Sequence, residues 1–276
     1  MQRVELTEQL WRHLTSLRDI RADNLGALSS HGEDNALSLY SPIALRNRRF
    51  VMAQVGQSLD GRVATLSGDA QDISGCDGIA HLHRCRALVD AVIVGVGTVA
   101  ADNPSLSVRA VSGKSPVRVV IDCNGRMPLD AKMLSDDGST VLIIQGDDMA
   151  PRTRRHETIL LPRSEDGIDP ANILDALGER GLTSILVEGG ARTISRFIDN
   201  GLVDRLHVSV APIIIGSGPA GISLSPVDKL SQIHRPKVSV YNIGTDIVFD
   251  CDLRAAAARS EAGLTESQDI LMADMA

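Results

Sequence analysis

Two glycine turns of this sequence each follow an uninterrupted apolar run. They are Gly95-Val96-Gly97-Thr98 and Glu188-Gly189-Gly190-Ala191. Glycine lets a ligand approach the backbone closely, and N–H groups at the start of a following helix attract an anion. In open α/β sheets, ligands bind at the carboxyl ends of the strands, which is where both turns are expected. The turns therefore predict a dinucleotide pyrophosphate site, although neither matches G-x-G-x-x-G and glycine in such turns often serves geometry alone.

The elements that would position these turns alternate between apolar runs and amphipathic segments. The predicted strands cover residues 50–57, 91–96, 117–122, 140–145, 184–187 and 206–215. The predicted helices cover residues 5–21, 76–90, 170–181 and 191–200. Residues 237–241 and 246–253 flank an Asn-Ile-Gly-Thr turn, which is typical of a hairpin. We therefore expect an α/β fold with a mostly parallel central sheet, flanking helices and a C-terminal antiparallel hairpin.

Three regions are expected along the chain. Residues 1–45 form an N-terminal helical extension, in which residues 22–42 are rich in Ser, Gly, Asn and Asp and are predicted to be a loop. We expect this extension to cover either the main domain or a partner subunit. Residues 46–253 form the main domain. Residues 254–276 are polar and alanine-rich, and are predicted to be a flexible tail.

Composition and charge restrict the class of protein. Aromatic residues make up only 2% of the 276 residues, so the core must be built from aliphatic side chains. A net charge of −7 argues against a nucleic-acid partner. No apolar run approaches the ~20 residues needed to span a bilayer, and the N-terminus lacks a secretory apolar core. We expect a cytoplasmic protein with no membrane partner.

The cysteines and histidines predict no metal site. The four cysteines include no C-x-x-C pair. His81-x-His83-x-Cys85 lies on a predicted helix, where side chains two positions apart do not face each other. His207 lies within a predicted strand and is expected to be a core or interface residue.

Three polar clusters carry a family resemblance. They are Ser58-Leu59-Asp60-Gly61-Arg62, then Gly95-Val96-Gly97-Thr98 followed by Asp102-Asn103-Pro104-Ser105-Leu106 and Arg109, and finally Leu186-Val187-Glu188-Gly189-Gly190. In this order and at these spacings the chain resembles the pyrimidine reductase domain of riboflavin-biosynthesis proteins, over residues 49–253. The resemblance implies a dihydrofolate-reductase-like fold. It also implies NADPH-dependent reduction of a ribosylamino-pyrimidine phosphate to the ribityl form.

Carried over residue by residue, the resemblance implies a cofactor site and a substrate site. The residues implied to contact NADPH are Ser74, Gly95, Gly97, Thr98, Asp102, Cys123, Gly189, Gly190, Ala191, Arg192 and Thr193. The residues implied to contact a phosphorylated small-molecule substrate are Asp60, Arg86, Leu106, Arg109 and Glu188. Because the family commonly forms homodimers, a homodimer is expected.

The chemistry of these side chains agrees with the implied reaction. Arg86 and Arg109 are predicted to clamp the substrate phosphate, because guanidinium groups bind phosphate bidentately. Reduction of an open-chain imine or carbonyl form of ribose needs an acid, for which Asp102 and Glu188 are the candidates. Asp102 could equally cap a helix or brace the Asn-Pro turn. Arg126 is either a contact for the 2′-phosphate of NADPH or an exposed loop residue.

The sequence departs from the family at three points. The H-x-E and P-C-x-x-C motifs of the zinc deaminase half are absent, which predicts a stand-alone reductase. Gln54 replaces a lysine that usually precedes the Ser-Leu-Asp-Gly turn, and Asp72 replaces an aromatic residue. Both changes fall in the implied substrate region. Two alternatives therefore stay open: a reductase of another small substrate such as a pterin, and a non-catalytic nucleotide-binding or assembly protein.

Overall fold

The computed structural model describes residues 2–19, 35–45, 49–136, 138–150 and 156–254. Its main strands are β1 (Gln2–Arg3), β2 (Phe50–Ser58), β3 (Ala91–Gly95), β4 (Val117–Ile121), β5 (Val141–Gly146), β6 (Glu157–Leu161), β9 (Ser184–Glu188), β10 (Arg205–Ala211), β11 (Lys237–Asn242) and β12 (Ile247–Asp252). A small separate hairpin comprises β7 (Arg163–Ser164) and β8 (Gly167–Ile168). The helices are α1 (Glu8–Asp19), α2 (Asn35–Ala44), α3 (Cys76–Leu88), α4 (Val96–Asp102), α5 (Pro170–Gly178) and α6 (Ala191–Asp199).

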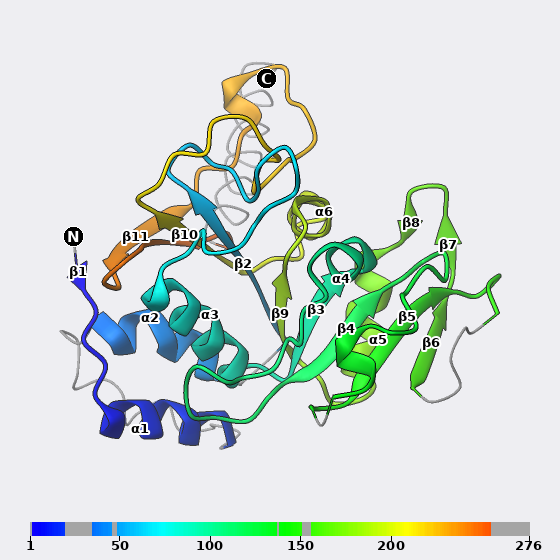
Figure 1. Ribbon diagram of the computed structural model, residues 1–276, viewed down its shortest axis with the longest axis horizontal. Coiled ribbons are helices and arrows are strands. Elements are labelled where there is room, and N and C mark those ends of the chain that lie inside the picture. The colour runs from blue at the N-terminus through cyan, green and yellow to red at the C-terminus, as the bar shows by residue number, and fades with distance from the viewer. Residues whose placement is uncertain (1, 20–34, 46–48, 137, 151–155, 255–276) are drawn as a thin grey trace, which may run out of the picture.

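One ten-stranded sheet runs through the molecule in the order β1-β11-β12-β10-β2-β9-β3-β4-β5-β6 (Figure 1). From β10 to β6 every neighbouring pair is parallel. β12 is antiparallel to both β10 and β11. The predicted parallel sheet with a C-terminal antiparallel hairpin is therefore confirmed.

The central strands are apolar because helices cover both of their faces. All five residues of β9 are buried, as are the first four of β3. Val, Ile and Leu dominate these runs, as expected for parallel strands buried on both sides. Ile93 in β3 lies opposite Val187 in β9, so both strands end at the same edge of the sheet. This register places the two glycine turns side by side.

Two hydrophobic clusters fill the space between the sheet and its helices. One contains Leu14 of α1, Leu39 of α2 and Leu88 of α3. The other contains Leu177 of α5 and Phe197 of α6. The strand β2 contributes to both, because successive side chains of a strand point to opposite faces.

The N-terminal segment packs on the main sheet of its own chain. Trp11 Nε1 donates to Ser112 O at 2.8 Å, and β1 adds a strand beside β11. The predicted loop over residues 22–42 is corrected for its described part, because α2 begins at Asn35. Polar composition and Pro42 hid the helical spacing of Leu39, Tyr40 and Ile43, all of which are fully buried.

Several boundaries also differ from those predicted. β10 ends at Ala211, directly before Pro212, which cannot donate to a strand partner. The helix α4 begins within the first glycine turn, and the edge strand β6 was not predicted. Residues 255–276 of the predicted tail lie outside the described residues. No helix in the described part of the chain combines the length and apolar character needed to cross a membrane.

Candidate active site

A cavity of 550 Å³ opens at the carboxyl ends of β3, β4 and β9. Both glycine turns contribute to its wall, through Gly95 to Thr98 and Gly190 to Thr193. Of the predicted cofactor residues, all but Ser74 and Gly189 line this cavity. A volume of this size is typical of small-molecule and cofactor sites. The structure therefore brings together the residues that the sequence assigned to a nucleotide.

The two turns are fitted to each other by glycine. Gly189 and Gly190 have φ values of 61° and 64°, which side-chain-bearing residues rarely adopt. A Cβ on Gly189 would lie 2.9 Å from Thr98 Cγ2, and one on Gly190 would lie 3.0 Å from Thr98 Oγ1. A Cβ on Gly97 would meet no heavy atom within 4 Å. Gly189 and Gly190 allow the two turns to pack closely against each other, whereas Gly97 leaves space at the cavity wall.

Arginines surround the cavity where α6 begins. Those that line it are Arg126, Arg163, Arg192 and Arg196. Gly190 is the N-cap of α6 and offers no side chain to that helix end, so the positive end of the helix dipole lies at the cavity. Arg196 Nη2 donates to Ile168 O at 3.0 Å, and Arg163 pairs with Asp148 at 2.5 Å. Asp102, Glu165 and Asp166 also line the cavity, so an anionic ligand is favoured at the start of α6 rather than over the whole wall.

The β7–β8 hairpin is a part of the cavity that the sequence did not reveal. Residues from Arg163 to Ile168 line the cavity together with the glycine turns. Both strands are only two residues long, too short for a periodic pattern. The Glu165-Asp166-Gly167 turn, in which Gly167 has a φ of 100°, is the one local signal that predicts a hairpin here.

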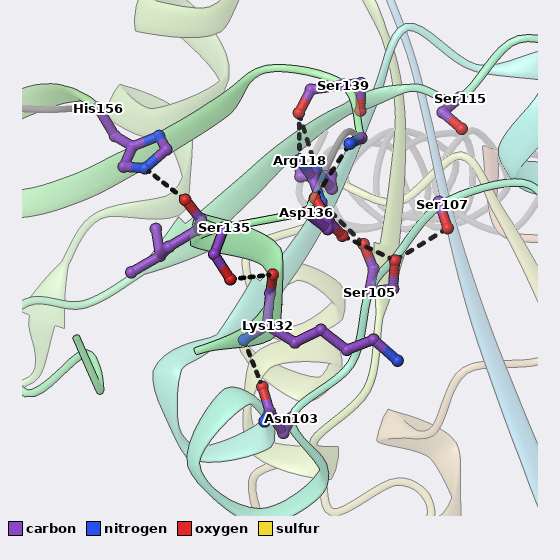
Figure 2. A network of polar contacts seen from close by, with 12 residues as sticks. Asn103, Ser105, Ser107, Ser115, Arg118, Lys132, Ser135, Asp136, Ser139 and His156 are labelled. Atoms are coloured by element: carbon purple, nitrogen blue, oxygen red, sulfur yellow. Dashed lines mark hydrogen bonds and ion pairs between the residues drawn. The ribbon is translucent and has the colours of Figure 1, made fainter. Parts of the chain in front are cut away.

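The loop after α4 is held by a buried polar network (Figure 2). Arg118 is 2% exposed; it pairs with Asp136 at 2.7 Å and donates to Ser105 O at 3.2 Å. Lys132 N donates to Asn103 Oδ1 at 2.8 Å. Asn103 and Leu106 both have positive φ, at 43° and 55°. The surrounding contacts thus maintain a backbone shape that these residues do not favour.

Asp102 lies at the start of this loop and lines the cavity. Its side chain is exposed at the wall, yet partial desolvation raises the pKa of its carboxyl above the ordinary value. A raised pKa lets a carboxyl hold a proton closer to neutral pH. The structure gives it neither of the two structural roles considered above, since the carboxyl neither caps α4 nor braces the Asn-Pro turn through any described hydrogen bond.

Arg86 and Glu188 form a buried ion pair. Arg86 Nε donates to Glu188 Oε1 at 2.8 Å, and Nη2 donates to Glu188 Oε2 at 2.7 Å. Their side chains are 7% and 6% exposed. A third donor, Arg86 Nη1, reaches Ser107 O at 3.2 Å. In this structure the fork of Arg86 is occupied, and Glu188 accepts from it with both oxygens. The predicted phosphate clamp and the predicted proton-donor role of Glu188 stay predictions.

Arg109 is exposed and its backbone is held by a buried histidine. His83 Nδ1 accepts from Arg109 N at 3.0 Å. Burial, together with the charges of Arg86 and Arg109, lowers the pKa of His83 to about 4. The imidazole therefore stays neutral, which keeps Nδ1 available as an acceptor.

The other predicted substrate residues have structural contacts. Leu106 is 2% exposed and belongs to the core. Asp60 accepts from Ser58 Oγ at 2.6 Å and from Gly216 N at 2.7 Å. Hydrogen bonds from Ser58 and from the backbone of Ile215 and Gly216 lower its pKa to about 2. Asp60 thus fixes the segment after β10.

The two family departures lie away from the cavity wall. Gln54 is buried in β2, opposite Glu188 on one side and His207 on the other. Asp72 has a φ of 57°, a left-handed conformation that Asp tolerates better than an aromatic residue. Ser74, two residues later, packs its Oγ against Gly56, where a Cβ would lie 2.7 Å away.

Comparison with known proteins places this geometry among riboflavin-biosynthesis proteins. A family model, the RibD C-terminal domain, matches residues 49–249. The riboflavin biosynthesis protein RibD of Aquifex aeolicus is 32% identical over 207 residues, which cover 74% of this chain and 58% of that protein. The 2,5-diamino-6-ribosylamino-4(3H)-pyrimidinone 5′-phosphate reductase of Methanothermobacter thermautotrophicus is 30% identical, covering 74% of this chain and 97% of that protein.

A solved structure supports the same assignment of the fold. The Thermotoga maritima diaminohydroxyphosphoribosylaminopyrimidine deaminase/5-amino-6-(5-phosphoribosylamino)uracil reductase superposes with a TM-score of 0.66 at 27% identity. The match covers 79% of this chain and 59% of that one. The chain thus spans little more than half the length of the bifunctional relatives that it matches. The predicted dihydrofolate-reductase-like fold is confirmed.

Proposed function

The chain belongs to the RibD C-terminal domain family, and from this membership we propose that it is an NADPH-dependent reductase. Its substrate is a ribosylamino-pyrimidine phosphate, whose ribosyl group is reduced to the ribityl form. The observation that carries the proposal is the cavity at the carboxyl ends of β3, β4 and β9, lined by both glycine turns. Relatives that are named as reductases of such a phosphate support the same conclusion.

The cavity fits a dinucleotide. Gly97 leaves the backbone accessible there, and α6 begins at the same wall. Gly190 to Thr193 would hold the pyrophosphate, and Arg126 would contact the 2′-phosphate that distinguishes NADPH from NADH. NADPH supplies the hydride when bound. If the assignment of Arg126 holds, Arg126→Met lowers the preference for NADPH over NADH, measured as the ratio of the two kcat/KM values.

The protein's own part in the reaction is to position the substrate and to supply one proton. Asp102, which lies at the cavity wall and has a raised pKa, is the proton donor when the open-chain imine or carbonyl form is reduced. Arg109 binds the substrate phosphate at the exposed end of the same loop. The Arg86–Glu188 pair acts as a positioning device, because Arg86 holds Ser107 O within that loop.

A two-step experiment tests this proposal. The protein is first titrated with NADPH, and NADPH oxidation is then followed with the ribosylamino-pyrimidine 5′-phosphate and with a panel of pterins. Turnover of the pyrimidine supports the proposal. Tight NADPH binding with turnover of a pterin alone would overturn the proposed pyrimidine substrate. This outcome matters because Gln54 and Asp72 depart from the family pattern. Failure to bind any nicotinamide nucleotide would overturn the reductase and favour a binding or assembly protein.

Assembly and location complete the proposal. We infer a cytoplasmic homodimer, because the family commonly dimerises and exposed apolar side chains gather after β10 and on the terminal hairpin. These are Ile213, Ile214, Leu224, Val227, Leu230, Ile233, Val238 and Phe249. Size-exclusion chromatography with light scattering measures the mass directly, and a monomeric mass at micromolar concentration would overturn the dimer.

A further inference from the structure

A buried cluster of nitrogen and sulfur atoms lies outside the cavity. It consists of His81 and Cys85 on α3 and His207 on β10, all with 0% exposure. His81 Nε2 lies 3.1 Å from His207 Nδ1 and 3.7 Å from Cys85 Sγ. The three donor atoms lie within 4.8 Å of one another. None of these residues lines the cavity, so the cluster has no part in the proposed reduction.

We propose that His81 Nε2, His207 Nδ1 and Cys85 Sγ bind one zinc ion. Zn–N and Zn–S bonds of about 2.0–2.1 and 2.3 Å in a tetrahedron place neighbouring ligand atoms about 3.3–3.6 Å apart. The two distances from His81 Nε2 are close to this range. A mixed set of imidazole and thiolate ligands also favours zinc over the oxygen-seeking divalent cations. Among the described residues only these three supply ligands, so water takes the fourth position.

Helical spacing explains why the sequence predicted no metal site. The sequence argues against a metal site when His81 is paired with His83, and His83 with Cys85, because each pair is two residues apart. His81 and Cys85 are instead four residues apart, which places them on one face of α3. His83 lies on another face and contacts the Arg109 loop. The third ligand, His207, comes from a strand and lies 122 residues after Cys85 in the sequence. No local pattern can indicate it.

The outer nitrogen of each histidine lies near a polar group, although that of His207 makes no hydrogen bond in this structure. His81 Nδ1 lies 2.9 Å from Tyr40 Oη, and His207 Nε2 lies 3.3 Å from Asp250 Oδ1. Zinc at Nε2 of His81 and Nδ1 of His207 leaves the ring protons on these outer atoms. A carboxylate facing the outer N–H of a ligating histidine is common at zinc sites. Arg205 holds Asp250 in turn, at 2.5 and 2.6 Å.

The charges around the cluster are compatible with a bound zinc ion once the Cys85 thiol has lost its proton. Burial raises the pKa of the Cys85 thiol, so without metal this group keeps its proton. Zinc replaces that proton, which passes to the solvent buffer as the Zn–S bond forms. Glu188 and Asp250 lie near Cys85 and oppose Arg84 and Arg86. Arg205, which pairs with Asp250, adds a further positive charge, and Asp252 lies near it. Three carboxylates thus face three guanidinium groups, and thiolate and zinc together add one positive charge to them.

The proposed ion joins elements that are distant in sequence. His81 and Cys85 come from α3 and His207 from β10, while Tyr40 belongs to α2. Its role is therefore structural: its ligands fasten α3 to β10 of the main sheet, and α2 is linked to the ion only through the contact of Tyr40 with His81. Structural zinc contributes directly to folding stability.

Metal analysis of the full chain, followed by titration of metal-free protein with Zn²⁺ and with Co²⁺, tests the proposal. We expect roughly one zinc per chain and a cobalt spectrum with a thiolate charge-transfer band. Cys85→Ser should lose that band, whereas Cys251→Ser, which alters a second buried thiol outside the cluster, should keep it. Tyr40→Phe should weaken zinc binding about 10-fold, because it removes the hydroxyl that faces the outer nitrogen of His81.

Three results would overturn the zinc site. They are zinc content far below one per chain with no saturable Zn²⁺ binding, a cobalt spectrum without a thiolate band, and equal affinity of the Cys85→Ser variant. If Cys85→Ser does not fold, the cobalt spectrum of the native chain and the affinity of the Tyr40→Phe variant for Zn²⁺ still test the zinc site. NADPH binding is measured separately, so failure of the zinc site leaves the proposed reductase untouched.

Discussion

The cavity wall and the interior beside β2 and β10 use polar groups in opposite ways. At the wall, glycine turns, the start of α6 and Asp102 leave polar groups facing the cavity. In the interior, polar side chains face one another: Arg86 pairs with Glu188, and Arg205 pairs with Asp250. The difference indicates that polar groups at the cavity wall serve ligand binding, whereas those in the interior beside β2 and β10 serve stability. Substitutions in the interior should therefore unfold the protein, and those at the wall should disable it while it stays folded.

Breaking the Arg86–Glu188 pair should have the largest effect. Arg86→Met leaves an uncompensated carboxylate at a buried site, which costs about 3–5 kcal/mol of the free energy of unfolding. Urea denaturation followed by circular dichroism measures this loss. The double variant Arg86→Met/Glu188→Leu removes both charges and should recover most of the stability. Equal stability of the single variant and the native chain would show that water reaches the pair.

Asp102→Asn should lower turnover without loss of stability. The amide keeps the size of the carboxyl but cannot donate its proton, so kcat should fall by about 10²-fold or more. The dissociation constant for NADPH and the urea midpoint should stay near the native values. Asp130→Asn, the same change at an exposed carboxyl that does not line the cavity, is the matched control. A kcat within threefold of the native value would exclude Asp102 as the proton donor.

Gly97→Val should block the cofactor by filling space. No heavy atom lies within 4 Å of the new Cβ, so the fold should accept it, while the side chain enters the cavity wall. We expect NADPH affinity to fall by about 10–100-fold, roughly 1.4–2.7 kcal/mol. Calorimetric titration gives this value. Gly178→Val, at a helical glycine with equally open surroundings away from the cavity, should bind NADPH as the native chain does.

The smallest effect should come from His83, which connects the two regions. Its folded-state pKa of about 4 lies below the unfolded value, so its stabilising contribution is complete above about pH 6.5 and is lost as pH falls toward 4. We expect the free energy of unfolding to fall over that interval by at most about 3 kcal/mol. Urea midpoints at several pH values measure it. In His83→Asn, which retains an acceptor but does not titrate, this part of the pH dependence should disappear.

The features predictable from the sequence are those with a local pattern. The central strands are apolar runs, and the glycine turns are short and contiguous, so the sequence alone predicts both. Helix α2 was missed because its polar residues and Pro42 outweighed the spacing of Leu39, Tyr40 and Ile43. The hairpin β7–β8 is too short to show any period.

Contacts between distant side chains were beyond prediction. Arg86 and Glu188 are 102 residues apart, and each alone is a plausible ligand contact. Only the fold shows that they satisfy each other. The same holds for His81 and His207, which the topology of α3 and β10 brings together across 126 residues.

The strand order also bears on how the chain is made. β2 is completed at Ser58, yet it lies between β9 and β10, which begin only at Ser184 and Arg205. At ribosomal rates of about 5–20 residues per second, β2 waits on the order of ten seconds for its first sheet neighbour. During that time both of its edges and its apolar faces lack their final partners. Synthesis of this protein therefore includes an interval in which chaperones have a specific segment to protect.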